Sequence, residues 1–541
     1  MTQLDPRACY RALEARDPRF DGRFFVGVTS TGIYCRPVCP ARTPKPANCR
    51  FFATAAAAQE AGFRPCLRCR PETAPDTGAW RGTSATVSRG LALIAEGALD
   101  GDDASVERLA ARLGVGERQL RRLFTQHLGA SPIAVAQTRR VHLAKHLIHE
   151  TRLPMAEVAL ASGFGSIRRF NETFRALFRK PPSALRRRTV TALPEGSAVV
   201  SGVTVRLSYR PPYDWPAMLA FLADRTIAGI DEVVREPGGE TYRRTVLIDG
   251  VSGTVEIRHL PQRHGLAATI RLPSLAALPS IIQRIRRVFD LGADVATIGQ
   301  HLARDRLLAP LVAARPGLRA PGAWDGFETA VRAVLGQQVS VQAARRLAGQ
   351  LVRICGTPLD LGLGAGSVGG TLTHAFPTAA QLAAADLTAL GMPGARKKAL
   401  RSLAEAALAD PHLFQPLATV EETVARLSAI SGIGDWTAHY IALRAVRETD
   451  AFPASDIGIL RGAAVNGTRP KPAELTLRAE PWRPWRAYAA QHLWAADAAR
   501  SQDLPPSRPA RGSSNRVAAR RGEAPAASVS ASGPHPRTAD D

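Results

Sequence analysis

The sequence has no run of 18 apolar residues, and its first thirty residues contain no apolar stretch typical of a signal peptide. We therefore expect no membrane span and a cytoplasmic protein. Acidic residues are also scarce, with 47 Asp and Glu against 71 Lys and Arg, which gives a formal charge of +24. This excess favours a polyanionic partner. The 541 residues predict three or four domains.

Cysteine is rare outside the N-terminal region, because six of the seven cysteines lie in residues 1–75. Four of them form the pairs Cys35-x3-Cys39 and Cys66-x2-Cys69, with 26 residues between the pairs. Such thiolate pairs suit one tetrahedral zinc ion with Zn–S bonds of about 2.3 Å. A purely structural zinc site is the alternative. The other two cysteines of this region receive no role.

The residues around these pairs, DGRFFVGVTSTGIYCRPVCPAR and AGFRPCLRCRPE, resemble the N-terminal domain of the Ada-type DNA methylphosphotriester repair proteins. The resemblance implies a small zinc α/β domain over residues 1–78. It further implies that Cys35 accepts the methyl group, while Cys35, Cys39, Cys66 and Cys69 hold one Zn²⁺. We also hypothesise that methylation of Cys35 makes the site less negative and so raises its affinity for DNA.

Two later segments have apolar residues at helical spacing, interrupted by a glycine at a turn. They span residues 106–128 and 155–178, and a helix from Ile133 to His149, about 25 Å long, is expected between them. Each segment predicts a helix-turn-helix whose second helix faces DNA. The candidate DNA-contacting residues are Arg118, Gln119, Arg121, Arg122, Arg168 and Arg169.

Residues 85–188 resemble the AraC-type double helix-turn-helix domain, most clearly in ASGFGSIRRFNETFR. The resemblance implies sequence-specific DNA binding and transcriptional control, with RNA polymerase as a partner. The alternative is a helical interaction domain whose basic face is only solvated.

In residues 198–292 apolar and polar residues alternate with a period of two, which predicts strands at 203–210, 242–249 and two further positions. Helices at 214–226 and 275–291 are expected to cover these strands. No chemistry is assigned to this segment. From residue 293 to 500 the pattern is helical throughout. Residues 501–541 are rich in Pro, Ser, Ala and Arg and are expected to be disordered.

The helical region contains Gly432-Ile433-Gly434 between two expected helices. Glycine at both positions permits positive φ and a close approach of the backbone to a DNA phosphate. About 20 residues later, FPASD predicts another helix start at Asp456. The alternative is that the glycines end one helix and that Asp456 merely caps the next.

The stretches GIGDWTAHYIALRA, FPASD, DGFETAVRAVLGQQ and PWRPWRAYAAQHLW resemble the helix-hairpin-helix DNA glycosylases, specifically their AlkA-type 3-methyladenine branch. The resemblance implies that Gly432 and Gly434 grip DNA and that Asp456 is catalytic. It implies also that the damaged base stacks on the rings of Trp436, Tyr440 and Trp494, and that Gln337 and Gln338 lie at the DNA, Gln338 as the wedge.

Core packing is the alternative for these rings and the preferred reading for Trp482 and Trp485. The lyase branch has lysine where this chain has Trp436, so a monofunctional enzyme is expected. No cysteine follows Cys355, so the iron–sulfur loop of related glycosylases is not expected, and no Pro-Cys-His-Arg acceptor motif for O6-methylguanine repair occurs.

The prediction is a multidomain, mainly α-helical protein with α+β parts: a zinc α/β domain, a double helix-turn-helix, a small α/β sheet domain and an all-α helix-hairpin-helix core. Its expected function is removal of alkylated purines, joined to methyl transfer onto Cys35 and to transcriptional regulation, in a nucleoid-associated monomer. The alternative is a transcription activator that senses alkylation and whose glycosylase half only binds DNA.

Overall fold

A four-stranded sheet, in the order β3-β1-β2-β4, organises the N-terminal residues. Strand β2 ends at Cys35, and the parallel partner of its Tyr34 is Pro65, the residue before Cys66. This register brings the two cysteine pairs to one end of the sheet. The elements are α1 (Pro6–Glu14), β1 (Phe25–Val28), β2 (Ile33–Cys35), η2 (Pro46–Asn48), β3 (Cys49–Phe52), α2 (Ala55–Glu60), β4 (Arg64–Pro65) and η3 (Pro71–Thr73).

This computed structural model describes residues 5–17, 20–74, 85–95, 97–100, 105–151, 153–186, 202–236, 239–248, 250–273, 277–359, 371–417 and 419–502. Almost all of the tail predicted from residue 501 lies outside these ranges. The chain is divided into the units Met1–Ala498 and Ala499–Asp541, and the description below concerns the first.

Both helix-turn-helix segments are present where the sequence predicts them. Gly114 and Gly163 make the two turns with φ of +67° and +83°. The helix between them is two residues longer than predicted, with Ser131 capping its start. The elements are α3 (Ala85–Ala95), α4 (Val106–Arg112), α5 (Glu117–Leu128), α6 (Pro132–Glu150), α7 (Met155–Ala161), α8 (Ile167–Phe178) and η4 (Pro182–Leu185).

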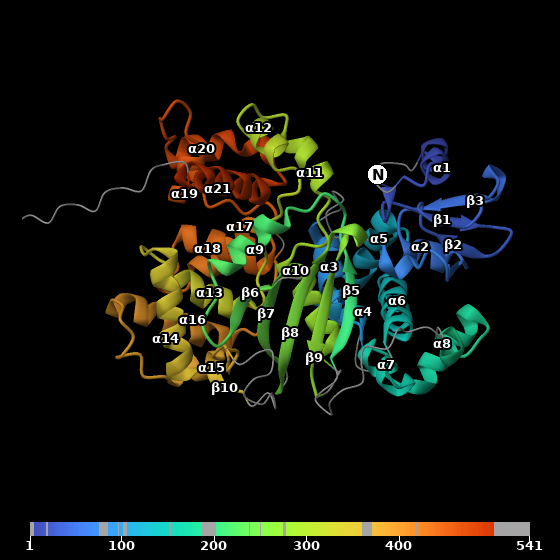
Figure 1. The fold of residues 1–541 in the computed structure, drawn as a ribbon, viewed down its shortest axis with the longest axis horizontal. Coiled ribbons are helices and arrows are strands. Elements are labelled where there is room, and N and C mark those ends of the chain that lie inside the picture. The colour runs from blue at the N-terminus through green and yellow to red at the C-terminus, as the bar shows by residue number, and fades with distance from the viewer. Residues whose placement is uncertain are drawn as a thin grey trace, which may run out of the picture. The chain divides into compact units, whose positions relative to one another are not determined.

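A five-stranded antiparallel sheet follows, with the strand order β5-β9-β8-β7-β6, and its strands lie side by side in green in Figure 1. Strand β6 was not predicted, because its sequence DEVVRE has only two apolar residues. The elements are β5 (Val203–Ser208), α9 (Trp215–Ala223), β6 (Asp231–Glu236), β7 (Gly239–Ile248), β8 (Val251–Leu260), η5 (Pro261–Arg263), β9 (Gly265–Arg271) and α10 (Leu278–Val288).

The remaining described residues are mostly helices packed around one large apolar cluster. The all-α prediction needs a small correction, because two short strands pair here. One of the helical elements, η6, is a π-helical turn. The elements are α11 (Val295–Leu302), α12 (Leu308–Ala314), α13 (Gly326–Leu335), α14 (Val341–Cys355), β10 (Thr357–Pro358), β11 (His374–Ala375), α15 (Ala379–Ala384), α16 (Gly394–Ala409), α17 (Val420–Ser428), α18 (Asp435–Ile441), η6 (Ala442–Val446), α19 (Ile457–Gly462), α20 (Pro472–Arg478), η7 (Glu480–Trp482) and α21 (Arg486–Gln502).

Trp482 and Trp485 are buried in this cluster, with 1% and 7% of their surfaces exposed, so the preference for core packing is confirmed. Within the part of the chain that the structure describes, no helix has the length and apolar character needed to cross a bilayer.

Candidate functional site

The four predicted metal ligands meet in one cluster. The Sγ atoms of Cys35, Cys39, Cys66 and Cys69 lie within 4.8 Å of one another. Zn–S bonds of about 2.3 Å place the sulfurs of a tetrahedral site about 3.8 Å apart, so the four side chains fit one zinc ion. The backbone N–H of Arg36 donates to the sulfur of Cys69 at 3.4 Å, which helps to orient that ligand.

A buried ion pair connects this cluster to helix α6. The Nζ atom of Lys145 donates to the backbone oxygen of Cys66 at 2.8 Å and to the Glu72 carboxylate at 2.7 Å. Lys145 is fully buried, and the Glu72 side chain is 1% exposed. Burial raises the pKa of Glu72, but His149 and Lys145 outweigh it and hold that pKa well below its usual range. The carboxylate is therefore ionised. Sequence reasoning missed this pair, since its members are 73 residues apart.

The six predicted DNA-contacting residues of the two helix-turn-helix segments are all exposed. Arg118, Gln119, Arg121 and Arg122 lie on α5, while Arg168 and Arg169 lie at the start of α8. Arg121 is within 2.6 Å of Glu117, and Arg168 is within 2.8 Å of Glu172, so two of the six are held by an acid one turn away.

The predicted hairpin connects α17 to α18. Gly432 has a φ of +85°, and a Cβ atom added there would lie 2.3 Å from the Cβ of Ala399 on α16. Gly434 has a φ of −84°, so only the first glycine uses the positive φ that glycine permits. Gly434 lies at the start of α18, with open space where a side chain would stand. Both glycines are exposed.

Asp456 lies at the start of α19 and is held by three N–H donors. Its Oδ1 atom accepts from the backbone of Ile459 at 3.0 Å and from Trp494 Nε1 at 2.8 Å. Its Oδ2 atom accepts from Trp436 Nε1 at 2.8 Å. Asp456 does cap a helix, as the alternative reading held, and it also joins two of the three rings chosen from the sequence.

The three rings are half-buried and adjoin one another. Trp436 and Tyr440 are stacked, with centroids 5.5 Å apart and an interplanar angle of 17°. Trp494 meets Tyr440 edge-on at 6.4 Å. The structure therefore brings Asp456, Trp436, Tyr440 and Trp494 together, although these residues span 59 positions of the sequence.

Sequence reasoning missed Arg444 and Arg225, which interact with these rings, and Phe221, which packs against both arginines. The buried guanidinium of Arg444 lies 4.9 Å from the ring centroid of Trp494 and 4.7 Å from that of Phe221 on α9. Burial raises the pKa of Tyr440, but Arg444 and Arg225 outweigh it and lower that pKa. Burial also lowers the pKa of Arg444 to about 10, so this side chain is still a cation at neutral pH. The sheet region, to which no chemistry was assigned, thus contributes to the site.

The two glutamines after α13 differ in their contacts. The amide of Gln337 donates to the backbone oxygen of Gly432 at 3.0 Å and to Thr437 Oγ1 at 3.1 Å. Gln337 therefore holds the hairpin to the end of α13. Gln338 is exposed and has a φ of +58°.

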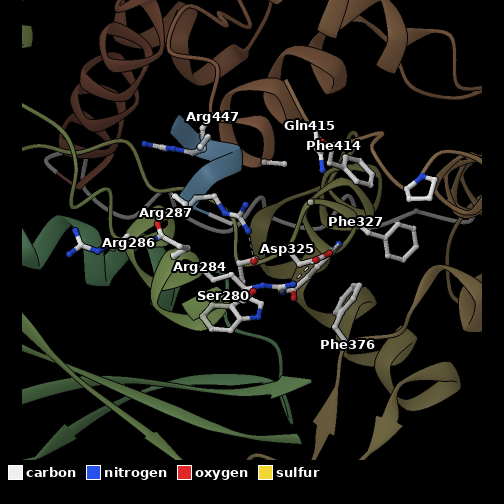
Figure 2. A pocket seen from close by; sticks show the side chains of 18 of the residues that line it. Ser280, Arg284, Arg286, Arg287, Asp325, Phe327, Phe376, Phe414, Gln415 and Arg447 are labelled. Carbon is white, nitrogen blue, oxygen red and sulfur yellow. Dashed lines mark hydrogen bonds and ion pairs between the residues drawn. The ribbon is translucent and has the colours of Figure 1, made fainter. Parts of the chain in front are cut away.

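A separate cavity of about 1020 Å³ is lined by arginines and aromatic rings, as Figure 2 shows. Its arginines have partners: Arg447 bonds to Asp290 at 2.6 Å, and Arg284 lies 3.5 Å from Asp325. None of the site residues predicted from the sequence is among the described residues that line this cavity. The site formed by Asp456 and the three rings, called the aromatic site below, therefore does not coincide with this cavity.

Comparison with protein families gives three matches. The metal binding domain of Ada matches residues 8–72, a helix-turn-helix domain matches residues 109–188, and the AlkA N-terminal domain matches residues 204–325.

Among individual proteins, the chain is 41% identical, over 91% of its length and 96% of the other's, to the "Probable bifunctional transcriptional activator/DNA repair enzyme AlkA" of Mycobacterium tuberculosis. It is 36% identical to DNA-3-methyladenine glycosylase 2 of Escherichia coli, over 53% of this chain and 95% of that protein. It is also 36% identical to the bifunctional transcriptional activator/DNA repair enzyme Ada of Escherichia coli, over 24% of this chain and 35% of that protein.

Proposed function

Because the chain belongs to the AlkA family of bifunctional transcriptional activators and DNA repair enzymes, we propose that it is a monofunctional DNA glycosylase of the 3-methyladenine type, joined to a methyl acceptor and a DNA-binding regulator. In this proposal residues 1–78 accept the methyl group and residues 85–188 bind DNA. Residues 198–292 and 293–500 together form the glycosylase, and residues 501–541 are a tail.

The observation that carries the glycosylase proposal is the position of Asp456. Its carboxylate is fixed by two indole N–H groups from separate helices, at 2.8 Å each, directly beside the stacked pair of Trp436 and Tyr440. A carboxylate held in this way is preorganised to stabilise a positive charge that develops on a sugar.

The proposed reaction begins with a purine that alkylation at N3 or N7 has made cationic. The bond between the sugar and the base breaks, its electron pair neutralises the base, and an oxocarbenium ion forms on the sugar. Asp456 stabilises this ion and orients a water molecule, as a carboxylate does in glycoside hydrolysis. The water adds to the sugar and loses a proton, which leaves an abasic site.

The three aromatic rings allow the site to bind damaged bases more tightly than normal ones. Stacking on an aromatic ring is worth about 1–3 kcal/mol per base, which offsets the few kcal/mol that extrusion of a nucleotide costs. A charged base gains up to about 2 kcal/mol more from cation–π attraction, which a normal base lacks. Trp436 and Tyr440 offer the stacking surface, with Trp494 at the edge of Tyr440. We propose that Gly432 and Gly434 hold the phosphate backbone and that Gln338 is the wedge.

The test is release of 3-methyladenine from alkylated duplex DNA. The variant Asp456→Asn should keep its DNA affinity and lose base release, whereas Asp386→Asn, at an exposed loop carboxylate, should keep both. Retained base release by Asp456→Asn would refute the assignment. An abasic-site assay on the unaltered protein also separates this proposal from the alternative, an alkylation-sensing activator whose glycosylase half only binds DNA.

For the N-terminal region we propose stoichiometric methyl transfer from a DNA methylphosphotriester to Cys35. A bound zinc ion keeps the four sulfurs deprotonated at neutral pH. The Cys35 sulfur attacks the methyl carbon, the bond between carbon and oxygen breaks, and the phosphate diester leaves as an anion. Mass spectrometry should find one added methyl group on Cys35 after incubation with methylated DNA, and none in Cys35→Ser. An unmodified Cys35 would leave the zinc purely structural.

We further propose that α5 and α8 read an operator, with RNA polymerase as the partner of an activating monomer in the cytoplasm, associated with the nucleoid. The six exposed residues of these helices support DNA binding. Footprinting of a promoter fragment should show two protected major grooves. Loss of both on replacement of Arg118 and Arg169 by alanine would support the assignment, and unchanged protection would overturn it.

A further inference from the structure

Polar contacts join helix α19 and its capping residue to helix α21; the proposed mechanism uses the first of those described here and leaves the second without a role. The first is the hydrogen bond from Trp494 Nε1 on α21 to Asp456, the residue that caps α19. The second is a bidentate pair between Arg461 on α19 and Asp497 on α21. Its two hydrogen bonds join Nε to Oδ1 at 2.8 Å and the terminal nitrogen to Oδ2 at 2.7 Å.

We propose that the pair of Arg461 and Asp497 is a positioning element for base excision, which holds the Trp494 indole on the Asp456 carboxylate. This inference rests on the proposed glycosylase function. Each of the two helices supplies one member of the carboxylate–indole contact and one member of the ion pair. A shift of α19 along α21 therefore disturbs both contacts together.

The packing between these helices explains why such a pair is needed. A Cβ atom added at Gly462 would lie 2.0 Å from the backbone oxygen of Leu493. One added at Gly458 would lie 3.1 Å from Trp494 Cδ1 and 3.3 Å from Asp497 Oδ2. At these two positions the backbone of α19 lies directly against α21, with no side chain of its own to interlock.

Helix α19 is also short, and Ile459 is its fully buried apolar side chain. It has six residues, and isolated helices of this length are unstable in water. A bidentate pair between arginine and carboxylate adds geometric specificity as well as attraction, because its two parallel hydrogen bonds fix the orientation of both groups. Arg461 and Asp497 therefore supply the alignment that side-chain packing at the glycines does not.

Arg461 also balances the charge of Asp497, whose Oδ2 atom lies near Gly458 at the edge of the site. The hydrogen bond to Asp497 raises the pKa of Arg461, and the charge of Asp456 contributes to the same shift, so Arg461 stays a cation.

The decisive variant is Asp497→Asn. This substitution removes a negative charge, so the affinity of the protein for DNA phosphates should be equal or higher. A slower excision would therefore not result from a lost phosphate contact. Because a misplacement of about 1 Å costs up to about 100-fold in rate, we expect single-turnover release of 3-methyladenine to slow about 10-fold. The dissociation constant for alkylated DNA should stay within about 2-fold, since binding at the hairpin is unchanged. The exchanged variant, Arg461→Asp with Asp497→Arg, should recover most of the loss.

The control is Arg478→Gln, which removes a pair between Arg478 and Asp305 in the same helical region. Its side chains are 38% and 18% exposed, against 44% and 15% for Arg461 and Asp497. This variant should excise at the rate of the unaltered protein. Thermal unfolding of each variant tests whether the fold is kept.

The outcomes separate this inference from the function on which it rests. If the unaltered protein releases no base, the proposed function fails and the inference falls with it. If the unaltered protein is active and Asp497→Asn is equally fast, the inference alone is overturned. It is overturned also if Arg478→Gln slows excision as much as Asp497→Asn, or if the exchanged pair gives no recovery.

Discussion

Gly432 and Gly434 lie two residues apart in one exposed hairpin, yet the structure predicts that a methyl group costs much more stability at Gly432 than at Gly434. In Gly432→Ala the residue must keep a φ of +85°, which costs an L-residue about 1–2 kcal/mol. The new Cβ atom would also lie 2.3 Å from the Cβ of Ala399, and such overpacking costs about 1–3 kcal/mol. Gly434→Ala meets open space at a φ of −84° and loses at most about 1 kcal/mol as a poorer helix cap.

The expected difference is measured by thermal unfolding of the full chain, followed by near-ultraviolet circular dichroism. A loss of about 3 kcal/mol lowers the midpoint by about 6–12 °C for a domain of this size, so Gly432→Ala should unfold clearly below Gly434→Ala. Adding Ala399→Gly to Gly432→Ala removes the clash and should restore part of the loss. Equal midpoints for the two single variants would refute the reasoning.

Three further predictions concern stability and metal. Lys145→Met should lower the free energy of unfolding by about 3 kcal/mol, because the substitution leaves the buried Glu72 carboxylate without the Lys145 ammonium group. Urea unfolding measures this loss, and an unchanged midpoint would contradict the prediction. Burial raises the pKa of Glu328, but two neighbouring guanidinium groups outweigh it and lower that pKa from 4.5 to about 2. Its stabilisation is therefore complete above pH 4.5 and is lost as the pH falls toward 2, and Glu328→Gln should flatten the acid limb of a stability profile. Cys39→Ser should lose zinc after dialysis, as measured by atomic absorption, while Cys355→Ser should keep it.

The sequence predicted the elements whose signals are local. The glycine turns at Gly114 and Gly163, the helix start at Asp456 and the cysteine pairs all depend on a few neighbouring residues. These patterns were sufficient to place both helix-turn-helix segments, whereas the three rings around Asp456 were selected through the family resemblance. The family resemblance supplied the expectation that the three rings adjoin this carboxylate.

The misses have physical reasons. Strand β6 has only two apolar residues, so it has no alternating pattern to detect. Phe221 on α9 and Arg225 just after it reach the site from more than 200 residues away in the chain, and only the tertiary fold brings them there. The identity of Gly434 left the sign of its φ angle open, because glycine permits both signs. The pairs Lys145–Glu72 and Arg461–Asp497 join distant segments and leave no local signal.

Because Lys145 is attached to the cysteine cluster, the length of helix α6 determines the angle between that cluster and the helices after α6. An α-helix turns by about 100° per residue, so a single inserted residue in α6 would rotate everything beyond it by that angle and advance it by about 1.5 Å. Lys145 follows the start of α6 by 13 residues, and its ammonium group is fastened to the oxygen of Cys66. An insertion before it would therefore rotate α7 and α8 and move Lys145 away from the oxygen of Cys66 in the same event. The length of this one helix therefore sets the angle between the helices that follow it and the four cysteines.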